Sequence, residues 1–417
     1  MSKSSLALEG AASVVTFAGS GPVRGPALGE PDVRSDASVI VDGAVIASVG
    51  RGGETERSFD ASGCTIVSGF VDPHTHLPFY GWRADEDAAR LSGFRYEQLH
   101  AGDGGIYRSA RLLSEASDDE VLGFGIELSD AMLRHGTTTF ETKSGYGLSL
   151  EAELRQLRLA RRLAEAVPQT VTTTCLAAHA VPKDHMAGEW IGRIATDLLP
   201  VVAAEGLASA CDIYVESIAF ALEHAARLAE TCSGLGLRMR IHADQLEDGQ
   251  AGSFAARWGF ASADHLNHTS LDAVDDIATS DTAAVLLPGA TFTLRQNKKP
   301  PARSLVDRGA IVALGTDLNP GTSPISSMPF AMALVCRTYG LRPVEALAAA
   351  TVNAAYVLGL DHAVGRVAPG YRADLVVLDV PDIEHLPYRP DRNPVIAVVC
   401  GGELVHVAER AHHRLRG

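Results

Sequence analysis

The sequence predicts an α/β protein, a (β/α)8 TIM-like barrel with a small β-sandwich domain formed from both termini. Three observations lead to this prediction. Strand-like and helix-like segments alternate from residue 68 to residue 365, polar residues follow the strand-like segments, and both ends of the chain are strand-rich. Alternating strands and helices imply parallel βαβ units, and about eight such units close into a barrel whose active site lies at the carboxyl ends of the strands.

Composition sets the broad class of the protein. The 417 residues are 46% hydrophobic and 21% charged, with a net charge of −15, an ordinary balance for a globular chain long enough for two structural units. The negative charge disfavours nucleic acid and anionic membranes as partners, because no basic tract outweighs the repulsion. A small anionic substrate held by one or two local cations remains compatible with it.

Cysteine spacing and the N-terminus indicate a cytoplasmic protein. The six cysteines are scattered without a C-x-x-C pair, as expected for reduced thiols. The first 21 residues lack the compact apolar segment of a signal peptide, and the chain has no apolar run of about 18 residues that predicts a transmembrane helix.

The three regions of the chain differ in pattern. Residues 1–67 contain short alternating segments, including 37–50 around Asp42-Gly43, a hairpin turn signal. Residues 366–417 return to strand-like segments at 365–380 and 394–407. We therefore expect one β-sandwich in two parts, 1–67 and 366–417, with the barrel at 68–365.

Within the central region, helical patterns cover 150–166 and 220–236. The strand-like segments are 136–147, 170–182, 211–217, 238–245, 262–268, 282–291 and 310–321. Histidines or acidic residues stand near the carboxyl ends of several of them, as the barrel prediction requires.

The segment Gly69–His76 carries the most specific local signal. It begins as an apolar run and ends in His74 and His76. On a strand, side chains two residues apart point to the same face, so both imidazoles can reach one metal ion. Two histidines in a solvent-facing loop explain an isolated H-x-H motif about equally well.

Further candidate ligands follow other strand-like segments. His242 and Asp317 complete a set of three histidines and a carboxylate, which suits a hydrolytic metal site with an open position. His265 is a candidate for acid–base work or for holding an oxyanion. Taken alone, His242 could equally be a histidine of the hydrophobic core, and Asp317 could be a turn residue. Because both stand at the ends of strands of one predicted barrel, the metal site is the favoured interpretation.

Several motifs together resemble one family. "DPHTH", "HADQL", "SADHL" and "TDLNPGTSP" are similar to the amidohydrolase superfamily, and H-x-H alone marks only that superfamily. The resemblance also includes "ETKSGYGL", "AAHAVP" and "AVLLPGA". Within these motifs, "KSGYGL" together with "HAVP" and "NPGTSP" narrows the resemblance to the imidazolonepropionase family. The resemblance runs from residue 66 to residue 360.

This resemblance implies hydrolysis of the ring amide of 4-imidazolone-5-propanoate to N-formimidoyl-L-glutamate, in histidine degradation, by a homodimer with one zinc or iron ion per chain, divalent or trivalent. The metal ligands of the family fall on His74, His76, His242 and Asp317. Its catalytic histidine falls on His265. As a hypothesis, the two catalytic residues are His265, which supports the oxyanion, and Asp317, which accepts a proton from the attacking water. Its substrate contacts fall on Arg83, Tyr146, His179, Gln245, Asn319, Gly321 and Thr322.

The substrate contacts make chemical sense, with simpler readings beside them. A guanidinium fork grips a propionate well, yet Arg83 in "GWRADED" fits a solvated surface arginine equally. Tyr146 stands between two glycines that let its loop approach a ligand, or it packs on its neighbours, and Gly321 fits a plain turn. Lys143 is interpreted as structural, because the family holds a single metal.

Two positions depart from the family pattern. Tyr80 and Trp82 stand where small residues are usual, near the expected mouth, and predict an altered substrate size. The alternative function is another amidohydrolase acting on a related cyclic amide or amidine, either a deaminase or a cyclic-imide hydrolase. In related deaminases a glutamate that shuttles protons commonly stands at the position of Gln245. Glutamine cannot titrate, so Gln245 disfavours a deaminase. A non-catalytic binding protein is disfavoured by the complete ligand set.

Overall fold

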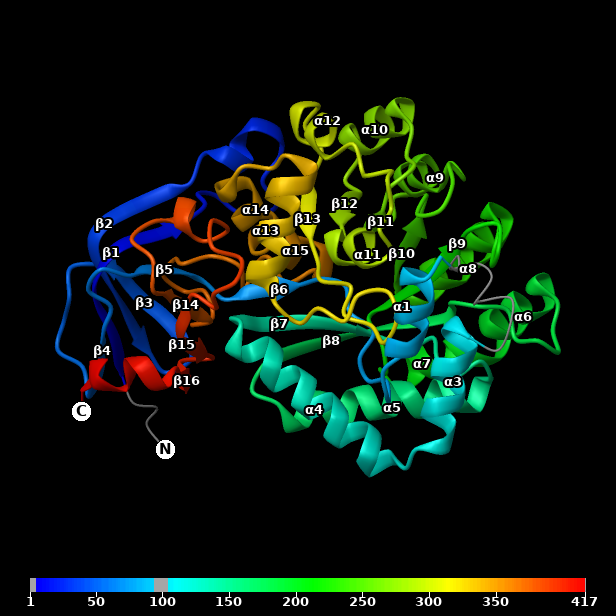
Figure 1. The fold of residues 1–417 in the computed structure, drawn as a ribbon, viewed down its shortest axis with the longest axis horizontal. Coiled ribbons are helices and arrows are strands. Elements are labelled where there is room, and N and C mark those ends of the chain that lie inside the picture. Colours follow the sequence, from blue (N-terminus) through cyan, green and yellow to red (C-terminus); the bar gives the residue numbers. More distant parts are fainter. Residues whose placement is uncertain (1–4, 94–103, 417) are drawn as a thin grey trace.

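An eight-stranded parallel sheet forms the barrel in the computed structural model, which describes residues 5–93 and 104–416 (Figure 1). Its strands pair in chain order, each with the next. They are β6 (Phe70–Asp72), β7 (Thr137–Lys143), β8 (Thr170–Ala178), β9 (Ala210–Val215), β10 (Arg238–Ala243), β11 (Ser262–His265), β12 (Ala283–Leu286) and β13 (Val312–Leu314). The predicted barrel is confirmed.

The barrel closes between its first and last strands, just beyond their carboxyl ends. Thr75 and Leu318 form a parallel bridge there. The backbone N–H of His76 donates to the carbonyl of Leu318 at 2.9 Å, and the N–H of Asp317 donates to the carbonyl of His74 at 3.0 Å. The closure therefore brings together two segments that carry predicted ligands.

Helices surround the barrel and cover its apolar strands. They are α1 (Ala84–Leu91), α3 (Gly105–Glu115), α4 (Asp118–Arg134), α5 (Leu150–Ala166), α6 (Ala187–Arg193), α7 (Leu199–Ala204), α8 (Leu222–Leu235), α9 (Ala251–Trp258), α10 (Leu271–Ala278), α11 (Pro288–Thr293), α12 (Ala302–Asp307), α13 (Met328–Tyr339), α14 (Pro343–Ala349) and α15 (Val352–Leu358). Local signals set their ends: a capping box of Ser117 and Glu120 begins α4, and Gly236 in a left-handed conformation ends α8.

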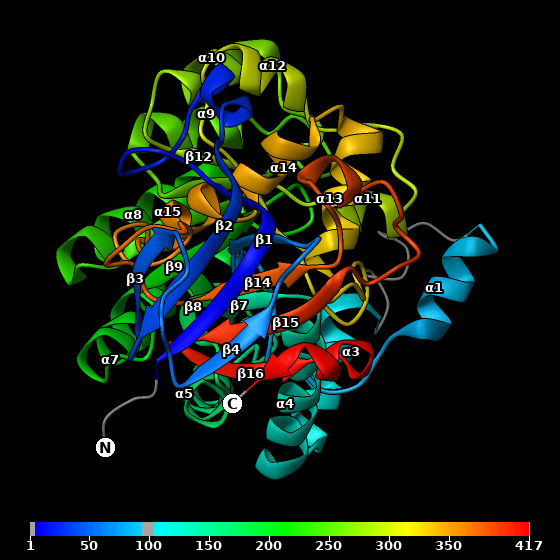
Figure 2. The ribbon, with the colours of Figure 1, turned by 90° about the vertical axis from the view of Figure 1, so that its left-hand side faces the viewer.

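Strands from both ends of the chain form the second sheet, which we call the terminal sheet (Figure 2). Its order is β16-β15-β14-β5-β1-β2-β3, with β4 beside β1 and β17 beside β4. The strands are β1 (Leu6–Thr16), β2 (Asp32–Asp42), β3 (Val45–Gly50), β4 (Arg57–Asp60), β5 (Thr65–Ser68), β14 (Leu375–Leu378), β15 (Val395–Cys400), β16 (Glu403–Val407) and β17 (Leu415–Arg416). The predicted small β domain of two termini is confirmed, and β2 and β3 form the predicted hairpin. The residue boundaries proposed for the domains remain predictions.

The terminal sheet connects directly to the barrel. β5 ends at Ser68 and β6 begins at Phe70, so Gly69 alone separates a strand of one sheet from a strand of the other. An added Cβ at Gly69 would lie 2.0 Å from Thr138 Oγ1. The backbone N–H of Gly69 donates to the carbonyl of Asp374 at 2.8 Å. A glycine is therefore required for this close approach.

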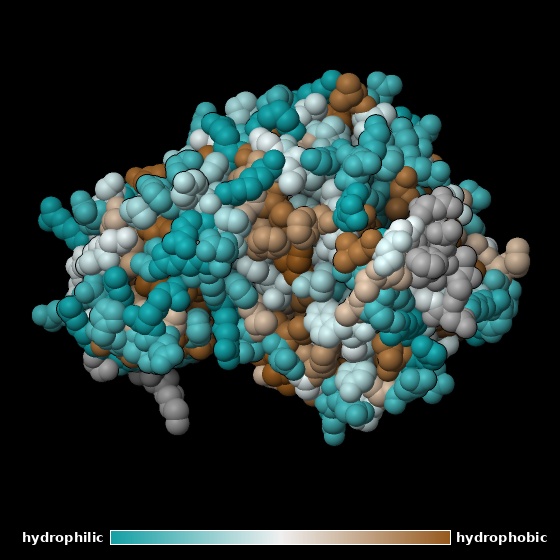
Figure 3. All heavy atoms as spheres, in the orientation of Figure 1, coloured by the Kyte–Doolittle hydropathy of each residue, from teal (hydrophilic) through white to brown (hydrophobic). Residues whose placement is uncertain are grey.

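The surface mixes residues of both kinds. Hydrophilic residues cover most of the face in Figure 3, and hydrophobic residues reach it in separate patches. Among the described residues, no helix combines the length and the hydropathy needed to cross a membrane.

Candidate active site

His74 and His76 lie just beyond β6, on either side of the bridge residue Thr75, and not on the strand as expected. Their rings still reach the same point, because the extended backbone continues past the strand. The two Nε2 atoms are 3.3 Å apart. The two imidazoles are therefore brought together by the segment that closes the barrel, and not by a strand as predicted.

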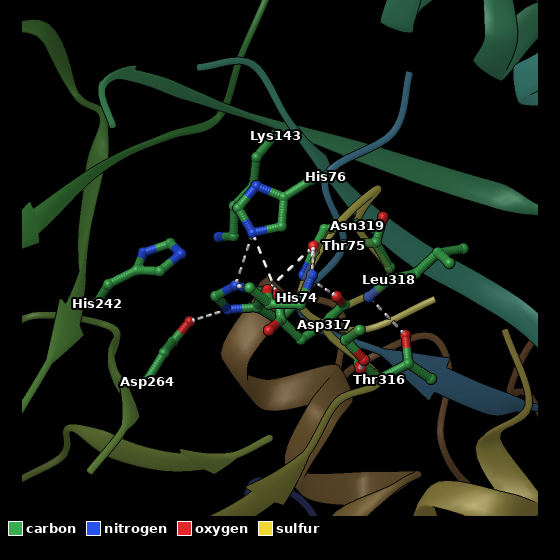
Figure 4. Close-up of polar contacts among 12 residues, drawn as sticks. His74, Thr75, His76, Lys143, His242, Asp264, Thr316, Asp317, Leu318 and Asn319 are labelled. Atoms are coloured by element: carbon green, nitrogen blue, oxygen red, sulfur yellow. Dashed lines mark hydrogen bonds and ion pairs between the residues drawn. The ribbon is translucent and has the colours of Figure 1, made fainter. Parts of the chain in front are cut away.

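His242 on β10 completes a cluster of three buried histidines. One ring nitrogen of each lies within 4.8 Å of the others, and this is the group of possible metal ligands found among the described residues. Figure 4 shows His242 facing His74 and His76 across a small space. His242 Nε2 is buried and has no hydrogen-bond partner within residues 5–93 and 104–416, as expected of a nitrogen that is available to a metal.

Buried carboxylates orient two of the three rings. His74 Nδ1 lies 2.6 Å from Asp264 Oδ2, and His242 Nδ1 lies 3.1 Å from Asp212 Oδ2. A carboxylate that accepts the Nδ1 proton leaves the Nε2 lone pair for a metal. Burial, aided by neighbouring cations, lowers the pKa of His74 and His76 well below the usual histidine value, so both rings are neutral, as ligands must be.

Asp317 follows β13 and lies beside the histidines. Its Oδ1 is 3.3 Å from His76 Nε2 and 3.6 Å from His74 Nε2. Burial raises the pKa of this carboxyl group. Its φ of 57° is left-handed, an uncommon conformation for a residue with a side chain and one found often at functional sites.

His265 ends β11 with a φ of 77° and is also buried. Burial lowers its pKa to about 3, so the ring is neutral over the physiological range. Its Nδ1 has no hydrogen-bond partner, and its ring centroid lies 5.2 Å from that of His242. A neutral imidazole here can donate one hydrogen bond to a substrate oxygen.

Most of the predicted residues line one cavity at the carboxyl ends of the strands, whereas His74 and Gly321 are not part of its lining. It encloses about 30 Å³ and is lined by His76, Arg83, Ile106, Tyr146, His179, Tyr214, His242, Gln245, His265, Asp317, Asn319 and Thr322. Sequence reasoning missed Ile106 and Tyr214, since an apolar residue and a strand tyrosine carry no distinctive signal. Another cavity of about 670 Å³ lies at the amino-terminal ends of β10 and β11, beside Trp258.

Tyr80 and Trp82 correct one expectation. Neither is among the described residues that line the cavity. Both pack edge-on against Phe124 of α4, with ring centroids 5.7 Å away in each pair, and Trp82 also contacts Phe79. The two side chains therefore belong to an aromatic cluster with Phe79 and Phe124. Burial of apolar surface and edge-to-face contacts stabilise such a cluster.

Arg83 is buried, which contradicts the reading of a solvated surface arginine. Only 3% of its surface is exposed, and its Nε and Nη1 atoms have no hydrogen-bond partner among the described residues. The nearest carboxylate oxygen, on Glu86, is 3.8 Å from Nε. An added Cβ at Gly321 would lie 1.8 Å from Arg83 Nη2, so this glycine makes room for the guanidinium.

The loop that carries Tyr146 is held by the first turns of α5. Glu153 accepts hydrogen bonds from the N–H groups of Gly145, Gly147 and Leu148 at 3.0, 2.6 and 3.2 Å, and Gln156 accepts one from Tyr146 at 3.0 Å. These bonds place the Tyr146 ring 5.4 Å from that of His179.

Asn319 uses its amide within its own loop. Its Nδ2 donates to the carbonyl of Asp317 at 2.7 Å, and its Oδ1 accepts from the N–H groups of Gly321 and Thr322 at 3.0 and 2.7 Å. The side chain therefore shapes the loop that presents Asp317 and makes room for Arg83.

Glu216 supports the segment that carries Gln245. Its Oε1 accepts from the N–H groups of Gln245 and Leu246 at 2.6 and 2.9 Å, and its Oε2 is buried without a partner. Burial raises the pKa of Glu216 to about 7. No motif marked this residue in the sequence.

Comparison with known proteins identifies close relatives. The sequence profile of the amidohydrolase family matches residues 65–405. The imidazolonepropionase of Rubrobacter xylanophilus is 44% identical over 97% of this chain and 99% of its own, and that of Symbiobacterium thermophilum is 41% identical over 96% and 97%. An atrazine chlorohydrolase variant from Arthrobacter aurescens, solved with zinc and atraton, shares the fold at 16% identity, with a TM-score of 0.72 over 98% of this chain and 96% of its own.

The donor set fits a divalent metal ion. Three imidazoles with a carboxylate beside them are nitrogen and oxygen donors that suit several such ions. The unpartnered Nε2 of His242 is otherwise a buried polar atom without compensation.

Proposed function

Since this chain belongs to the imidazolonepropionase family of amidohydrolases, we propose that it hydrolyses the ring amide of 4-imidazolone-5-propanoate to N-formimidoyl-L-glutamate, in histidine degradation. One observation carries the proposal: a cluster of possible metal ligands and the buried, incompletely paired guanidinium of Arg83 share one cavity. A substrate with a reactive carbonyl at one end and a carboxylate at the other suits that pair.

The proposed ligands are His74, His76, His242 and Asp317, for one zinc or iron ion per chain. A metal bound there supplies Lewis acidity toward the ring carbonyl and lowers the pKa of water. Imidazole and carboxylate ligands suit both zinc and iron, so metal analysis of the purified protein is needed to distinguish them.

Asp317 and His265 are the proposed catalytic residues. Asp317 accepts a proton from the attacking water and returns it to the ring nitrogen as the C–N bond breaks. His265 donates a hydrogen bond to the oxygen that gains charge. A neutral imidazole, as the lowered pKa of His265 implies, carries the one N–H group that this bond needs. Gln245 takes no proton and can only hydrogen-bond the ring.

The remaining contacts hold the substrate. Arg83 grips the propionate with its free donor atoms, while Tyr146, His179 and Thr322 line the walls, and Asn319 and Gly321 shape the loop beneath. The space of about 30 Å³ among these side chains is smaller than the substrate, so we expect lining side chains to move when it binds.

The direct test is incubation of the purified protein with 4-imidazolone-5-propanoate, with loss of its absorbance followed and the product identified by mass spectrometry. We expect turnover by the wild type and none by His265→Ala. His268→Ala is the matched control, since His268 lies three residues away and outside the cavity lining. No turnover by the metal-loaded wild type would refute this substrate. A homodimer and a cytoplasmic location remain predictions.

A further inference from the structure

Beneath the three histidines, the barrel interior contains five charged side chains in contact with one another, which we call the ion chain. They come from β7, β9, β10 and β11, and each is at most 1% exposed: Glu141, Lys143, Asp212, Arg240 and Asp264. Three carboxylates and two cations in so small a volume are costly to bury, because burial removes the water that stabilises each charge.

Contacts within the ion chain run without a break. Arg240 Nη2 donates to Asp264 Oδ2 at 2.7 Å, and Arg240 Nη1 donates to Glu141 Oε1 at 2.9 Å. The same Glu141 oxygen accepts from Lys143 Nζ at 2.7 Å, and Lys143 Nζ also donates to Asp212 Oδ2 at 2.8 Å. Each cation therefore joins two carboxylates.

Both ends of the ion chain stop at a predicted metal ligand. Asp264 Oδ2 lies 2.6 Å from His74 Nδ1, and Asp212 Oδ2 lies 3.1 Å from His242 Nδ1. Figure 4 shows Asp264 and Lys143 on opposite sides of His74, with His242 nearby. A merely space-filling role does not explain this, since apolar side chains of similar volume fill a core at least as stably.

We infer that Arg240, Glu141 and Lys143 are positioning residues that couple His74 to His242, so that one network fixes the tautomer and orientation of both rings. The inference rests on the proposed ligand set and deepens it. Arg240 has the central role, because its planar fork alone can hold Asp264 and Glu141 at fixed angles while Nη1 also donates to the carbonyl of Pro73 at 2.7 Å.

Arg240→Lys tests the fork, since it keeps a buried positive charge. We expect the folded variant to bind zinc about 10–100-fold more weakly than wild type in chelator competition, the usual effect of losing a partner of a ligand histidine. Arg366→Lys is the matched control: Arg366 is 2% exposed, donates to the carbonyls of Phe17 and Gly21 far from the site, and should leave zinc affinity unchanged.

Glu141→Gln tests the hub of the ion chain with an isosteric side chain. It removes the charge that lies between two cations and should also weaken zinc binding by about 10-fold or more. Glu345→Gln is its control, because Glu345 is equally buried against Arg303 and Arg342 outside the barrel site. Circular dichroism confirms that each variant is folded.

A measurement on the metal-free wild type needs no variant. In protein labelled with ¹⁵N-histidine, two-bond couplings should place the proton of both His74 and His242 on Nδ1. A proton on Nε2 of either ring overturns the inference, as does full zinc affinity in both folded variants. A wild type that binds no zinc overturns the proposed function and this inference with it, whereas the other two results overturn the inference alone.

Discussion

Arg83 is the residue that we propose as the anion-binding group of the cavity. Its guanidinium is removed from water, held near the loop at Gly321, and left with two donor atoms free. Such a group is unfavourable until an acceptor arrives, so the binding free energy of a carboxylate substrate includes relief of this cost.

Arg83→Lys should therefore lower kcat/KM for 4-imidazolone-5-propanoate by about 10–100-fold, mainly through KM, because an ammonium group cannot form the paired hydrogen bonds. The control is on the substrate: an analogue with a propionamide should lose much less. Equal losses for both compounds would show that Arg83 does not contact the carboxylate.

Glu216 should make stability depend on pH. Its pKa in the folded protein, about 7, lies above the usual glutamate value, so its favourable contribution is present below pH 4 and is lost as pH rises through 7. From pH 5 to pH 8, wild type should lose on the order of 2 kcal/mol of unfolding free energy relative to Glu216→Gln, which keeps the carbonyl acceptor. Parallel pH curves from urea denaturation would contradict this.

At the scale of single residues, the sequence predicts the candidate ligands better than the residues that hold them in place. His74, His76 and His242 stand out because imidazole is rare and chemically distinctive. Asp264 lies in the quoted motif "SADHL", but its partner is a histidine 190 residues away in the chain, and the motif does not reveal that contact. Contacts between distant residues depend on barrel closure, which sequence patterns do not specify.

Among the elements, α5 does more than cover the barrel. Its Glu153 receives three backbone N–H groups from the loop that carries Tyr146, and an added Cβ at Gly147 would lie 2.4 Å from the backbone nitrogen of Glu153. The helix and the loop are therefore one rigid unit at the cavity wall.

Glu153→Ala should destabilise the protein by about 2–3 kcal/mol, since it leaves buried N–H groups without an acceptor, and should raise KM as Tyr146 becomes less ordered. Thermal unfolding and steady-state kinetics measure the two effects. Glu151→Ala, an exposed change in the same first turn, should alter neither. If both variants behave alike, the loop does not depend on Glu153.

Element types were predictable because the periodicities are strong, whereas their ends were less so. The histidine pair lies past β6 because the strand stops at Asp72, whose side chain accepts from the Oγ1 of Thr316 at 2.5 Å and from its N–H at 3.1 Å. That contact joins the first and last barrel strands, and only the closed barrel creates it.

At the scale of the whole molecule, the terminal sheet and the barrel share a continuous chain segment from β5 to β6. The packing of Gly69 against Thr138 and Asp374 links the two sheets at the amino-terminal end of β6. Strand-rich ends predicted one β unit, but its strand order depends on pairings between opposite ends of the chain, such as β5 with β14, which local patterns do not specify.

We expect both sheets to unfold in one transition. The three tryptophans, Trp82, Trp190 and Trp258, lie outside the terminal sheet, while Cys64 is buried in its core. Tryptophan fluorescence and alkylation of Cys64, located by mass spectrometry, should therefore give the same urea midpoint. Earlier alkylation of Cys64 would show that the terminal sheet opens independently.

In the proposed active site, three histidines and Asp317 hold one catalytic metal ion beside an arginine that binds carboxylate. Stepwise return of zinc or iron to the stripped protein tests this arrangement most directly. Hydrolysis of 4-imidazolone-5-propanoate should rise in proportion to bound metal and saturate at about one ion per chain, and His242→Ala should recover neither metal nor activity. Full turnover by the stripped protein, or by His242→Ala without metal, would contradict the account.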